Sequence, residues 1–428
     1  MTRPATHMTR TAVRLILLVS CAHALVHVFE LALPSVEQMI GEELVGKTAE
    51  ENKAATGALS TAWRVPFGML AMVAGWLADR YGSRRLLVVY LLGCIVTSIV
   101  AASSQSMTPL LISMLVMGGF ASIYHPAGLS LISRVTTPET RGRALGWHGI
   151  FGSIGITAAP MGAAVMFGTG WLGWRGYYMA LCIPAVVIGI LVLVSIRRVG
   201  STRETTLPGN PSDTQNTATT QGGRFQRIPY LLLVTSGALS GFVYASFLHF
   251  LQRYLDGAGI RPDSVSAESF RNLLAAVTLS FAVGGQWLAG RLARPGRLER
   301  LQVVILLASM PSLVLMSVAS GWLCLLATCS FAFIHFMTQP VYNSLIAQFV
   351  PSRRRSTGYG FSNMVCFGIG GLGPLVVGQS TNNQLIYCSL ATIVGLSALF
   401  ATVLWWTTKN PANTAANTAA NTTPPHTS

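Results

Sequence analysis

Three side chains that could bind a metal ion or a proton lie close together near the start of the chain: His23, His27 and Glu30. Their spacing of four and then three residues places them on one face of an α-helix. Imidazole and carboxylate groups together suit a first-row divalent metal such as Fe(II), so the three residues form a candidate metal site. Histidine also titrates near neutral pH, so the same groups could couple proton movement to solute movement. Hydrogen bonding between helices, without any ligand, is the third interpretation.

Further polar side chains interrupt other apolar stretches of the sequence. Ionisable groups at membrane depth are costly and usually face a cavity or a partner. Arg64 is expected at a depth similar to that of Glu30, so an ion pair between them would relieve two buried charges. His148, beside Trp147, is interpreted as structural. The other candidates for substrate or ion binding are Tyr124, His125, His249, His335, Gln339 and Asn343.

The composition of the chain predicts that these residues lie in a membrane. Only 10% of the 428 residues are charged and 51% are hydrophobic, whereas soluble domains carry about 25% charged residues. Apolar runs of about 20 residues, each long enough to cross a bilayer as a helix, recur from end to end. We therefore expect an all-α membrane protein with twelve transmembrane helices. They are predicted at 13–34, 55–78, 85–105, 109–131, 144–167, 176–197, 230–254, 271–291, 301–319, 321–348, 356–380 and 383–407.

The charges predict the orientation of these helices. Most Lys and Arg residues fall in the segments that alternate spans place on one side, which predicts a multi-pass inner-membrane protein with both termini in the cytoplasm. The net charge of +15 is dispersed over several segments near lipid headgroups, so it does not indicate nucleic-acid binding. A P-loop and a closely spaced Cys/His zinc motif are both absent from the sequence, so we expect neither an enzyme nor a cofactor.

The chain divides into two similar halves. We expect a cytoplasmic N-terminus at 1–12, six-helix bundles at 13–197 and 230–407, a cytoplasmic linker at 198–229 and a disordered cytoplasmic tail at 408–428. Trp76-Leu77-Ala78-Asp79-Arg80 returns as Trp287-Leu288-Ala289-Gly290-Arg291, and Pro126 returns as Pro340. Paired helical halves are typical of secondary transporters, which bind their substrate between the halves near the midplane.

The stretch GWLADRYGSRR, residues 75–85, resembles the signature loop between spans 2 and 3 of the major facilitator superfamily. That resemblance implies two pseudo-symmetric six-helix bundles, a central cavity lined by spans 1, 4, 7 and 10, and a gating latch on the cytoplasmic side. Ser83 departs from the pattern, and Gly290 replaces the acid in the second half, so the latch should be one-sided. The residues assigned to the gating loop are Gly75, Asp79, Arg80, Gly82, Arg84 and Arg85.

Two further stretches bear on the substrate. Residues 120–155 resemble the fosmidomycin-resistance-like branch of the superfamily, and with HALVHVFELALPSVEQ at 23–38 they resemble magnetosome permeases of the MamH type. This resemblance implies iron transport for magnetite biomineralisation, across the inner or magnetosome membrane. Many drug/proton antiporters of the superfamily carry an arginine four residues before the glycine in span 4. Met114 stands four residues before Gly118 here, which lowers the case for drug efflux.

The sequence thus predicts a permease that moves a small solute by alternating access. The substrate hypothesis is iron, ionic or chelated, with protons as a further candidate partner and membrane lipid around the bundle. The alternative is proton-coupled efflux of a small toxic compound such as a fosmidomycin-like drug. A second alternative is a membrane scaffold or sensor that transports nothing. Glycines in spans 5 and 11 are interpreted as helix-packing positions.

Overall fold

The computed structural model describes residues 8–170, 172–200, 225–351 and 354–409, and no strand occurs among them. Eleven of the described helical segments are long and apolar enough to cross a membrane. The first half contains α1 (Arg10–Ile40), α2 (Ala49–Met69), α3 (Ala71–Tyr81), α4 (Ser83–Ser103), α5 (Met107–Ala121), α6 (Tyr124–Val135), α7 (Pro138–Gly168) and α8 (Trp174–Gly200). The second half contains α9 (Arg227–Asp256), α10 (Ala267–Leu292), α11 (Leu298–Val318), α12 (Trp322–His335), α13 (Thr338–Phe349), α14 (Arg355–Asn363), α15 (Gly373–Val377) and α16 (Asn383–Lys409).

The predicted span at 55–78 is built from two helices, α2 and α3, which meet at Leu70. With this pair, the eleven candidates are compatible with the predicted twelve spans. Three other spans are also segmented. Span 4 consists of α5 and α6, span 10 of α12 and α13, and span 11 continues from α14 to α15 through a π-helical turn and a 3₁₀ turn. The breaks in spans 4 and 10 both fall just before a proline, Pro126 or Pro340, which the sequence repeat pairs.

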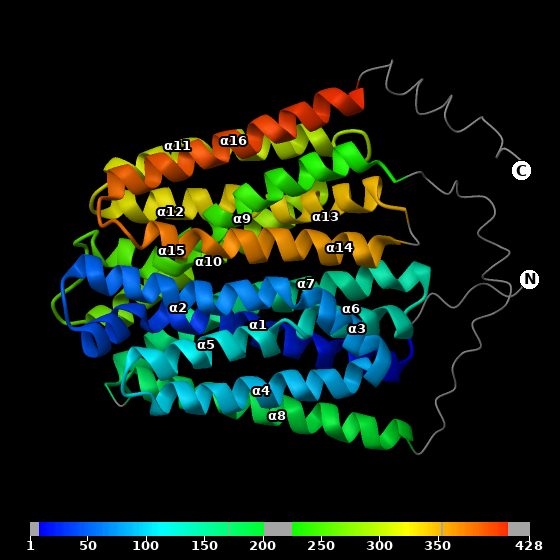
Figure 1. The fold of residues 1–428 in the computed structure, drawn as a ribbon, viewed down its shortest axis with the longest axis horizontal. Helices are drawn as coiled ribbons and strands as arrows, with labels where there is room; N and C mark the ends of the chain where they lie inside the picture. Colours follow the sequence, from blue (N-terminus) through cyan, green and yellow to red (C-terminus); the bar gives the residue numbers. More distant parts are fainter. Residues whose placement is uncertain (1–7, 171, 201–224, 352–353, 410–428) are drawn as a thin grey trace, which may run out of the picture.

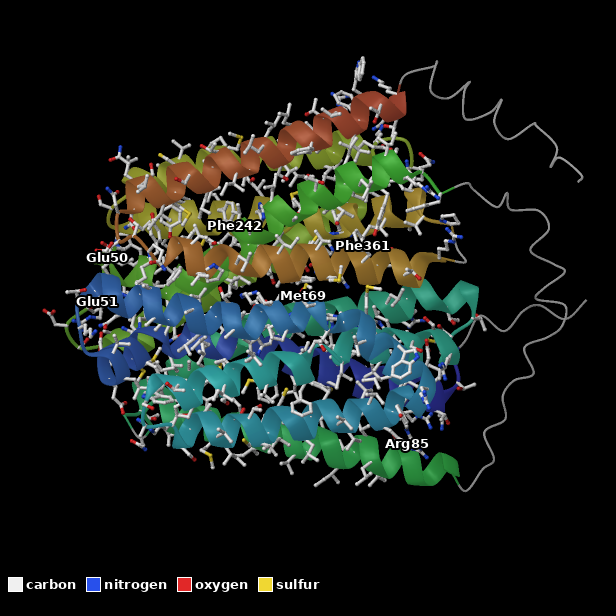
Figure 2. All side chains as sticks on the ribbon, viewed as in Figure 1. Glu50, Glu51, Met69, Arg85, Phe242 and Phe361 are labelled. Carbon is white, nitrogen blue, oxygen red and sulfur yellow. The ribbon has the colours of Figure 1, made fainter. Side chains whose placement is uncertain are left out.

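The two halves lie side by side, with α7 and α10 between them (Figure 1). The first described helix begins and the last one ends at the same end of the bundle, which we call the terminus side (Figure 1). The opposite end is the far side. Glu50 and Glu51 lie at the far side and Arg85 lies near the terminus side (Figure 2). The predicted linker at 198–229 and tail at 408–428 fall mostly outside the described residues, so their bounds stay predictions.

Glycines let the central helices approach one another, as the sequence predicts for spans 5 and 11. A Cβ on Gly155 of α7 would lie 2.2 Å from the carbonyl oxygen of Ala24, so the backbones of α7 and α1 are in contact. In span 11, a Cβ on Gly371 would lie 2.8 Å from the Cβ of Arg64. Both contacts are made within one or two turns of the predicted site residues, so the glycines set how closely that site is enclosed.

The start of α2 is fixed by a capping box on the far side. Thr48 accepts a hydrogen bond from the backbone amide of Glu51, and its own amide and hydroxyl donate to the Glu51 carboxylate. These hydrogen bonds lower the pKa of Glu51. The capping box satisfies backbone amides that the first helical turn leaves without partners. It therefore sets the register in which α2 carries Arg64 to the middle of the bundle.

Candidate functional site

A chain of hydrogen bonds joins the predicted residues of α1 to α2 and α7. The Glu30 carboxylate accepts from Arg64 Nη1 at 2.8 Å and lies 2.8 Å from His27 Nδ1. His27 Nε2 lies 3.2 Å from His23 Nε2, and His23 Nδ1 lies 2.8 Å from the backbone oxygen of His148. The Glu30–Arg64 ion pair predicted from the sequence is confirmed, with both side chains buried. Pairing offsets much of the cost of burying the two charges.

The acceptors at the two ends of this chain fix where the hydrogens lie. A carbonyl oxygen only accepts, so His23 Nδ1 donates to His148. An ionised carboxylate also only accepts, so His27 Nδ1 donates to Glu30. These two bonds orient both imidazole rings and aim their Nε2 atoms at each other. The rings are therefore preorganised around one small space.

The break between α5 and α6 brings two more predicted residues to this space. Tyr124 is buried, stacks on His23 with centroids 5.2 Å apart, and donates from its hydroxyl to the Val19 carbonyl at 2.8 Å. His125 is half-buried and meets His23 edge-on at 5.3 Å between centroids. One ring nitrogen from each of His23, His27 and His125 lies within 4.8 Å of the others, a grouping that could hold a metal ion.

His148 belongs to the same cluster, although the sequence analysis interprets it as structural. Its ring stacks on His23 with centroids 4.0 Å apart and planes 6° apart. A signal for this position was present, because His148 lies four residues before Gly152 and seven before Gly155. Both glycines pack against α1, and a Cβ on Gly152 would lie 2.4 Å from the His23 ring. His148 is therefore on the α7 face that packs against α1.

The second half faces this cluster with aromatic and neutral polar groups. The Arg64 guanidinium carbon lies 6.0 Å from the centre of the Tyr244 ring of α9, and Tyr244 lies 5.3 Å from Phe336. Tyr244 is not among the predicted site residues, since nothing near it in the chain distinguishes it from an aromatic residue that faces lipid. Its ring is thus one second-half contact of the Glu30–Arg64 pair, beside the close approach of Gly371 to Arg64.

The other predicted binding residues of the second half lie apart from the histidine cluster. His335 is buried, and its Nε2 lies 3.2 Å from the Ser240 hydroxyl. Gln339 is exposed and accepts from Gln286 at 2.9 Å, and Asn343 is exposed one turn further along α13. His249 is buried, and neither of its ring nitrogens has a hydrogen-bond partner among the described residues.

The predicted gating loop joins α3 and α4 on the terminus side. Gly82 has φ of +91°, so the tight turn predicted there is present. Asp79 lies 3.5 Å from Arg134 of α6, in the same half, and both side chains are exposed. In this state Asp79 therefore pairs within the first half. A Cβ on Gly75 would lie 3.6 Å from Pro126, an ordinary contact, so close packing does not require glycine there.

The arginines of this loop differ in their surroundings. Arg80 lies over the Trp76 ring at 5.4 Å, and the repeat-related Arg291 lies over Trp287 at 4.0 Å. The sequence repeat between the halves therefore also repeats a cation–π contact. Arg84 buries its Nε atom without a partner among the described residues, and Arg85 is exposed near the terminus side (Figure 2).

Polar contacts on the far side join the two halves, and the sequence analysis missed them. Glu37 of α1 is buried and accepts from Arg253 of α9 at 2.6 and 3.1 Å, and from the Thr56 hydroxyl. Nearby, Asn272 of α10 donates to the Ser35 carbonyl at 2.9 Å. Glu37 follows Glu30 by seven residues and so shares its helix face. That spacing was the signal for an acid facing the second half.

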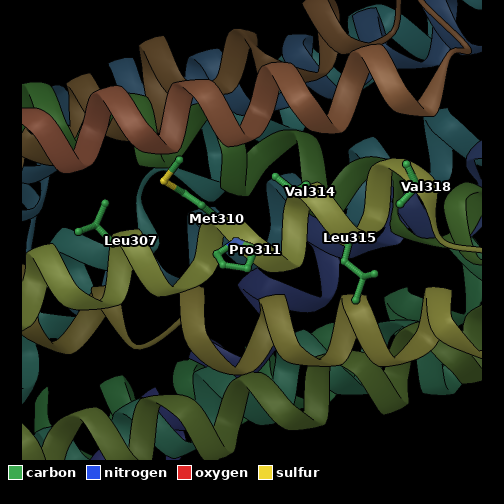
Figure 3. Close-up of a pocket in the computed structure, with 6 residues that line it drawn as sticks. All are labelled: Leu307, Met310, Pro311, Val314, Leu315 and Val318. Atoms are coloured by element: carbon green, nitrogen blue, oxygen red, sulfur yellow. The ribbon is translucent and has the colours of Figure 1, made fainter.

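An apolar groove on the outside of the second half is a different kind of feature. It is lined on α11 by Leu307, Met310, Pro311, Val314, Leu315 and Val318 (Figure 3). These side chains offer no charged or hydrogen-bonding group to a solute. A surface of this composition suits lipid acyl chains and does not compete with the central cluster as the solute site.

Comparison with known proteins places the chain among transport proteins. The sequence model of the Major Facilitator Superfamily matches residues 19–374. The puromycin resistance protein pur8 of Streptomyces alboniger is 29% identical over 185 residues, which are 42% of this chain and 35% of that protein. The multidrug export protein EmrB of Haemophilus influenzae is 31% identical over 142 residues, which are 33% of this chain and 26% of that protein. The matched regions thus span about a third or less of these relatives.

Solved structures share the fold at low sequence identity. A bacterial homologue of the human lysosomal transporter Spinster, in an inward-facing and occupied conformation, has a TM-score of 0.70 at 15% identity, over 94% of this chain and 98% of that one. The xylose transporter XylE of E. coli, in an inward-open conformation, has a TM-score of 0.71 at 14% identity, over 91% and 95% of the two chains. At these identities the likeness shows the fold alone.

Proposed function

The chain belongs to the Major Facilitator Superfamily, and on that premise we propose that it exports a small organic compound across the inner membrane by alternating access. The observation that carries this proposal is the contact of Tyr244 with the buried Arg64–Glu30 pair, since it joins the two halves at the middle of the bundle. A solute bound there would touch aromatic rings and one ion pair. Solute sites are commonly of this kind, largely apolar with a few placed polar groups.

The state of the two ends supports alternating access. The Glu37–Arg253 pair and the Asn272 contact join the halves on the far side. Towards the terminus side, the polar side chains of Gln339 and Asn343 are exposed. We assign the terminus side to the cytoplasm because the basic loops lie there. We infer from this arrangement an inward-facing state, in which the halves are joined most tightly on the far side.

Export is favoured over import by the names of the relatives, which include a resistance protein and a multidrug export protein. The test measures the accumulation of puromycin and fluorescent aromatic cations in an efflux-deficient host. We expect the wild-type chain to lower accumulation and Glu30→Gln to abolish this effect. Glu50→Gln, which changes an exposed acid on the far side, is the matched control and should behave as wild type. Equal accumulation with and without the wild-type chain, for every compound, contradicts organic export.

Iron transport, ionic or chelated, is the second candidate, and one observation favours it. The ring nitrogens of His23, His27 and His125 lie within 4.8 Å of one another, a donor set suited to a divalent transition metal. The resemblance to magnetosome permeases supports the same cargo and a magnetosome membrane location. Coupling to protons through these histidines stays a prediction for either cargo.

Radioactive iron uptake into membrane vesicles of both orientations distinguishes the two candidates. If iron is the cargo, wild-type vesicles take it up and His27→Ala vesicles do not. Equal iron uptake by wild-type and His27→Ala vesicles would contradict iron transport through this site. A scaffold or sensor, the remaining alternative, predicts that neither cargo moves and that substitutions in the predicted 198–229 linker have the larger effect.

A further inference from the structure

We propose that His23, His27 and His125 bind one divalent first-row transition metal ion where α1 faces the start of α6. The nearest pair of donors, His23 Nε2 and His27 Nε2, are 3.2 Å apart. A ring nitrogen of His125 completes a group within 4.8 Å. This inference deepens the second candidate function, because an iron carrier must first bind iron.

The separation of the donor atoms fits a shared metal ion. Imidazole nitrogens bind such ions at about 2.1 Å, so two nitrogens 3.2 Å apart would subtend about 100° at the metal. That angle is close to the values of tetrahedral and octahedral coordination. The third imidazole needs only a small movement to reach the same ion, and His125 is half-buried at a helix break. The site therefore needs little rearrangement to form.

The other nitrogen of each central ring already has the partner that a metal-binding histidine needs. His23 Nδ1 donates to the His148 carbonyl, and His27 Nδ1 donates to the Glu30 carboxylate. Metal-bound histidines generally donate their second N–H to a carbonyl or carboxylate, which fixes the tautomer with the lone pair on the metal side. Glu30 is thus an outer partner of the ion, whereas the sequence analysis places it among the direct ligands.

The metal ion would take the position of a hydrogen atom. Both Nδ1 atoms donate, so the bond between His23 Nε2 and His27 Nε2 requires one further hydrogen on one of these nitrogens. An incoming ion forms two N–metal bonds, and the displaced hydrogen leaves as a proton. Metal binding by histidine generally releases protons in this way.

The charge around the site selects the class of ion. Both oxygens of the Glu30 carboxylate already accept a hydrogen bond, from Arg64 and His27, and the three grouped donors of the site are imidazole nitrogens. Three imidazoles suit zinc, cobalt, nickel or iron and are poor ligands for magnesium and calcium. The ligand class is therefore a borderline divalent transition metal.

Cobalt(II) is the probe for the test, because nitrogen ligation gives it a visible absorption spectrum. It is titrated into the full-length chain, purified in detergent without a histidine tag. His7 and His426, which lie outside the described residues, are replaced by glutamine in all samples. We expect one ion per chain in this background, and binding at least tenfold weaker in His27→Gln and in His125→Gln. Magnesium should not compete with cobalt, whereas zinc should.

One matched variant controls the experiment. His335→Gln removes a buried imidazole of the second half, apart from the histidine cluster. It should bind cobalt within about threefold of the background chain, and size-exclusion profiles identify any variant that fails to fold. Unchanged binding in folded His27→Gln or folded His125→Gln overturns the proposal, and so does an absence of binding in the background chain. The titration measures binding and not transport, so an absence of cobalt binding would not contradict the proposed export of an organic compound.

Discussion

The two halves of the bundle share a backbone plan and differ in the groups they hold at its centre. Spans 4 and 10 both break just before a proline, at positions that the sequence repeat pairs. The residues directly before these prolines, His125 in the first half and Gln339 in the second, therefore correspond to each other in the repeat. The first half links Arg64, Glu30 and two histidines by hydrogen bonds, whereas the second half pairs the neutral groups Ser240 with His335 and Gln286 with Gln339.

This difference shows that the two halves can keep the same backbone fold while they hold different chemical groups at the centre. The repeated backbone gives both halves a break before the paired prolines of spans 4 and 10 and an exposed Trp–Arg contact, which serve packing and orientation. The buried ion pair at the middle of the bundle, Glu30–Arg64, belongs to the first half. Recognition of a polar solute should therefore depend mainly on α1, α2 and α6. The second half then supplies an aromatic wall through Tyr244 and Phe336. Substitutions of central residues should therefore have larger effects in the first half than in the second.

The largest loss of stability is expected when one charge of the Glu30–Arg64 pair is removed. Glu30→Gln leaves Arg64 buried without a counter-charge, and breaking a buried pair in this way costs about 3–5 kcal/mol. Removing both charges, with Glu30→Gln and Arg64→Gln together, should restore part of that loss, since no lone charge remains. Thermal unfolding of the three variants in detergent measures this. A double variant less stable than either single one would show that the two residues do not act as a pair.

A smaller effect is expected where the two halves meet on the far side. Glu37→Gln weakens the contact with Arg253 between the two halves, so on the proposed function the far side should open more often. A single cysteine introduced at the buried Ser35, in a cysteine-free background, reports opening through its rate of modification. We expect a rate several-fold higher in Glu37→Gln than in the Glu50→Gln control. Equal rates would mean that the Glu37–Arg253 contact does not keep the two halves together on the far side.

Part of the site could be predicted from the sequence because helix periodicity is a local property. The face shared by His23, His27 and Glu30 follows from their spacing, and the Arg64 pair follows from comparing depths in two spans. That Glu37 shares this face follows from its spacing in the same way, although Glu37 is not among the predicted site residues. Tyr244 could not be found in this way, because its role depends on which helix of the other half it meets. Nor was the break after Met69 predicted, although Pro66 lies three residues before it and proline is a common cause of such breaks.

A weaker effect is expected in the second half. His335→Gln removes one hydrogen bond to Ser240 and keeps a polar side chain of similar length, so it should cost about 1 kcal/mol in stability. Solute flux should fall by no more than about threefold, because no charge is left unpaired. Thermal unfolding and accumulation assays measure the two quantities. A loss of flux as large as that of Glu30→Gln would show that the halves contribute equally to recognition, and the contrast between them would fail.

The smallest effect on stability is expected at the gating loop of the first half. Asp79 and Arg134 expose 77% and 55% of their side chains, and exposed ion pairs contribute about 0–1 kcal/mol. Asp79→Asn should therefore leave the unfolding temperature nearly unchanged. If Asp79 also forms the latch in a second state, as the superfamily resemblance implies, flux should still fall severalfold, and Asp79→Glu should restore part of it. The repeat-related Gly290 carries no acid, so Gly290→Ala is the matched control and should leave flux unchanged. Wild-type flux in Asp79→Asn would mean that this acid only helps to orient the helices, and the difference between the two loops would then have no role in transport.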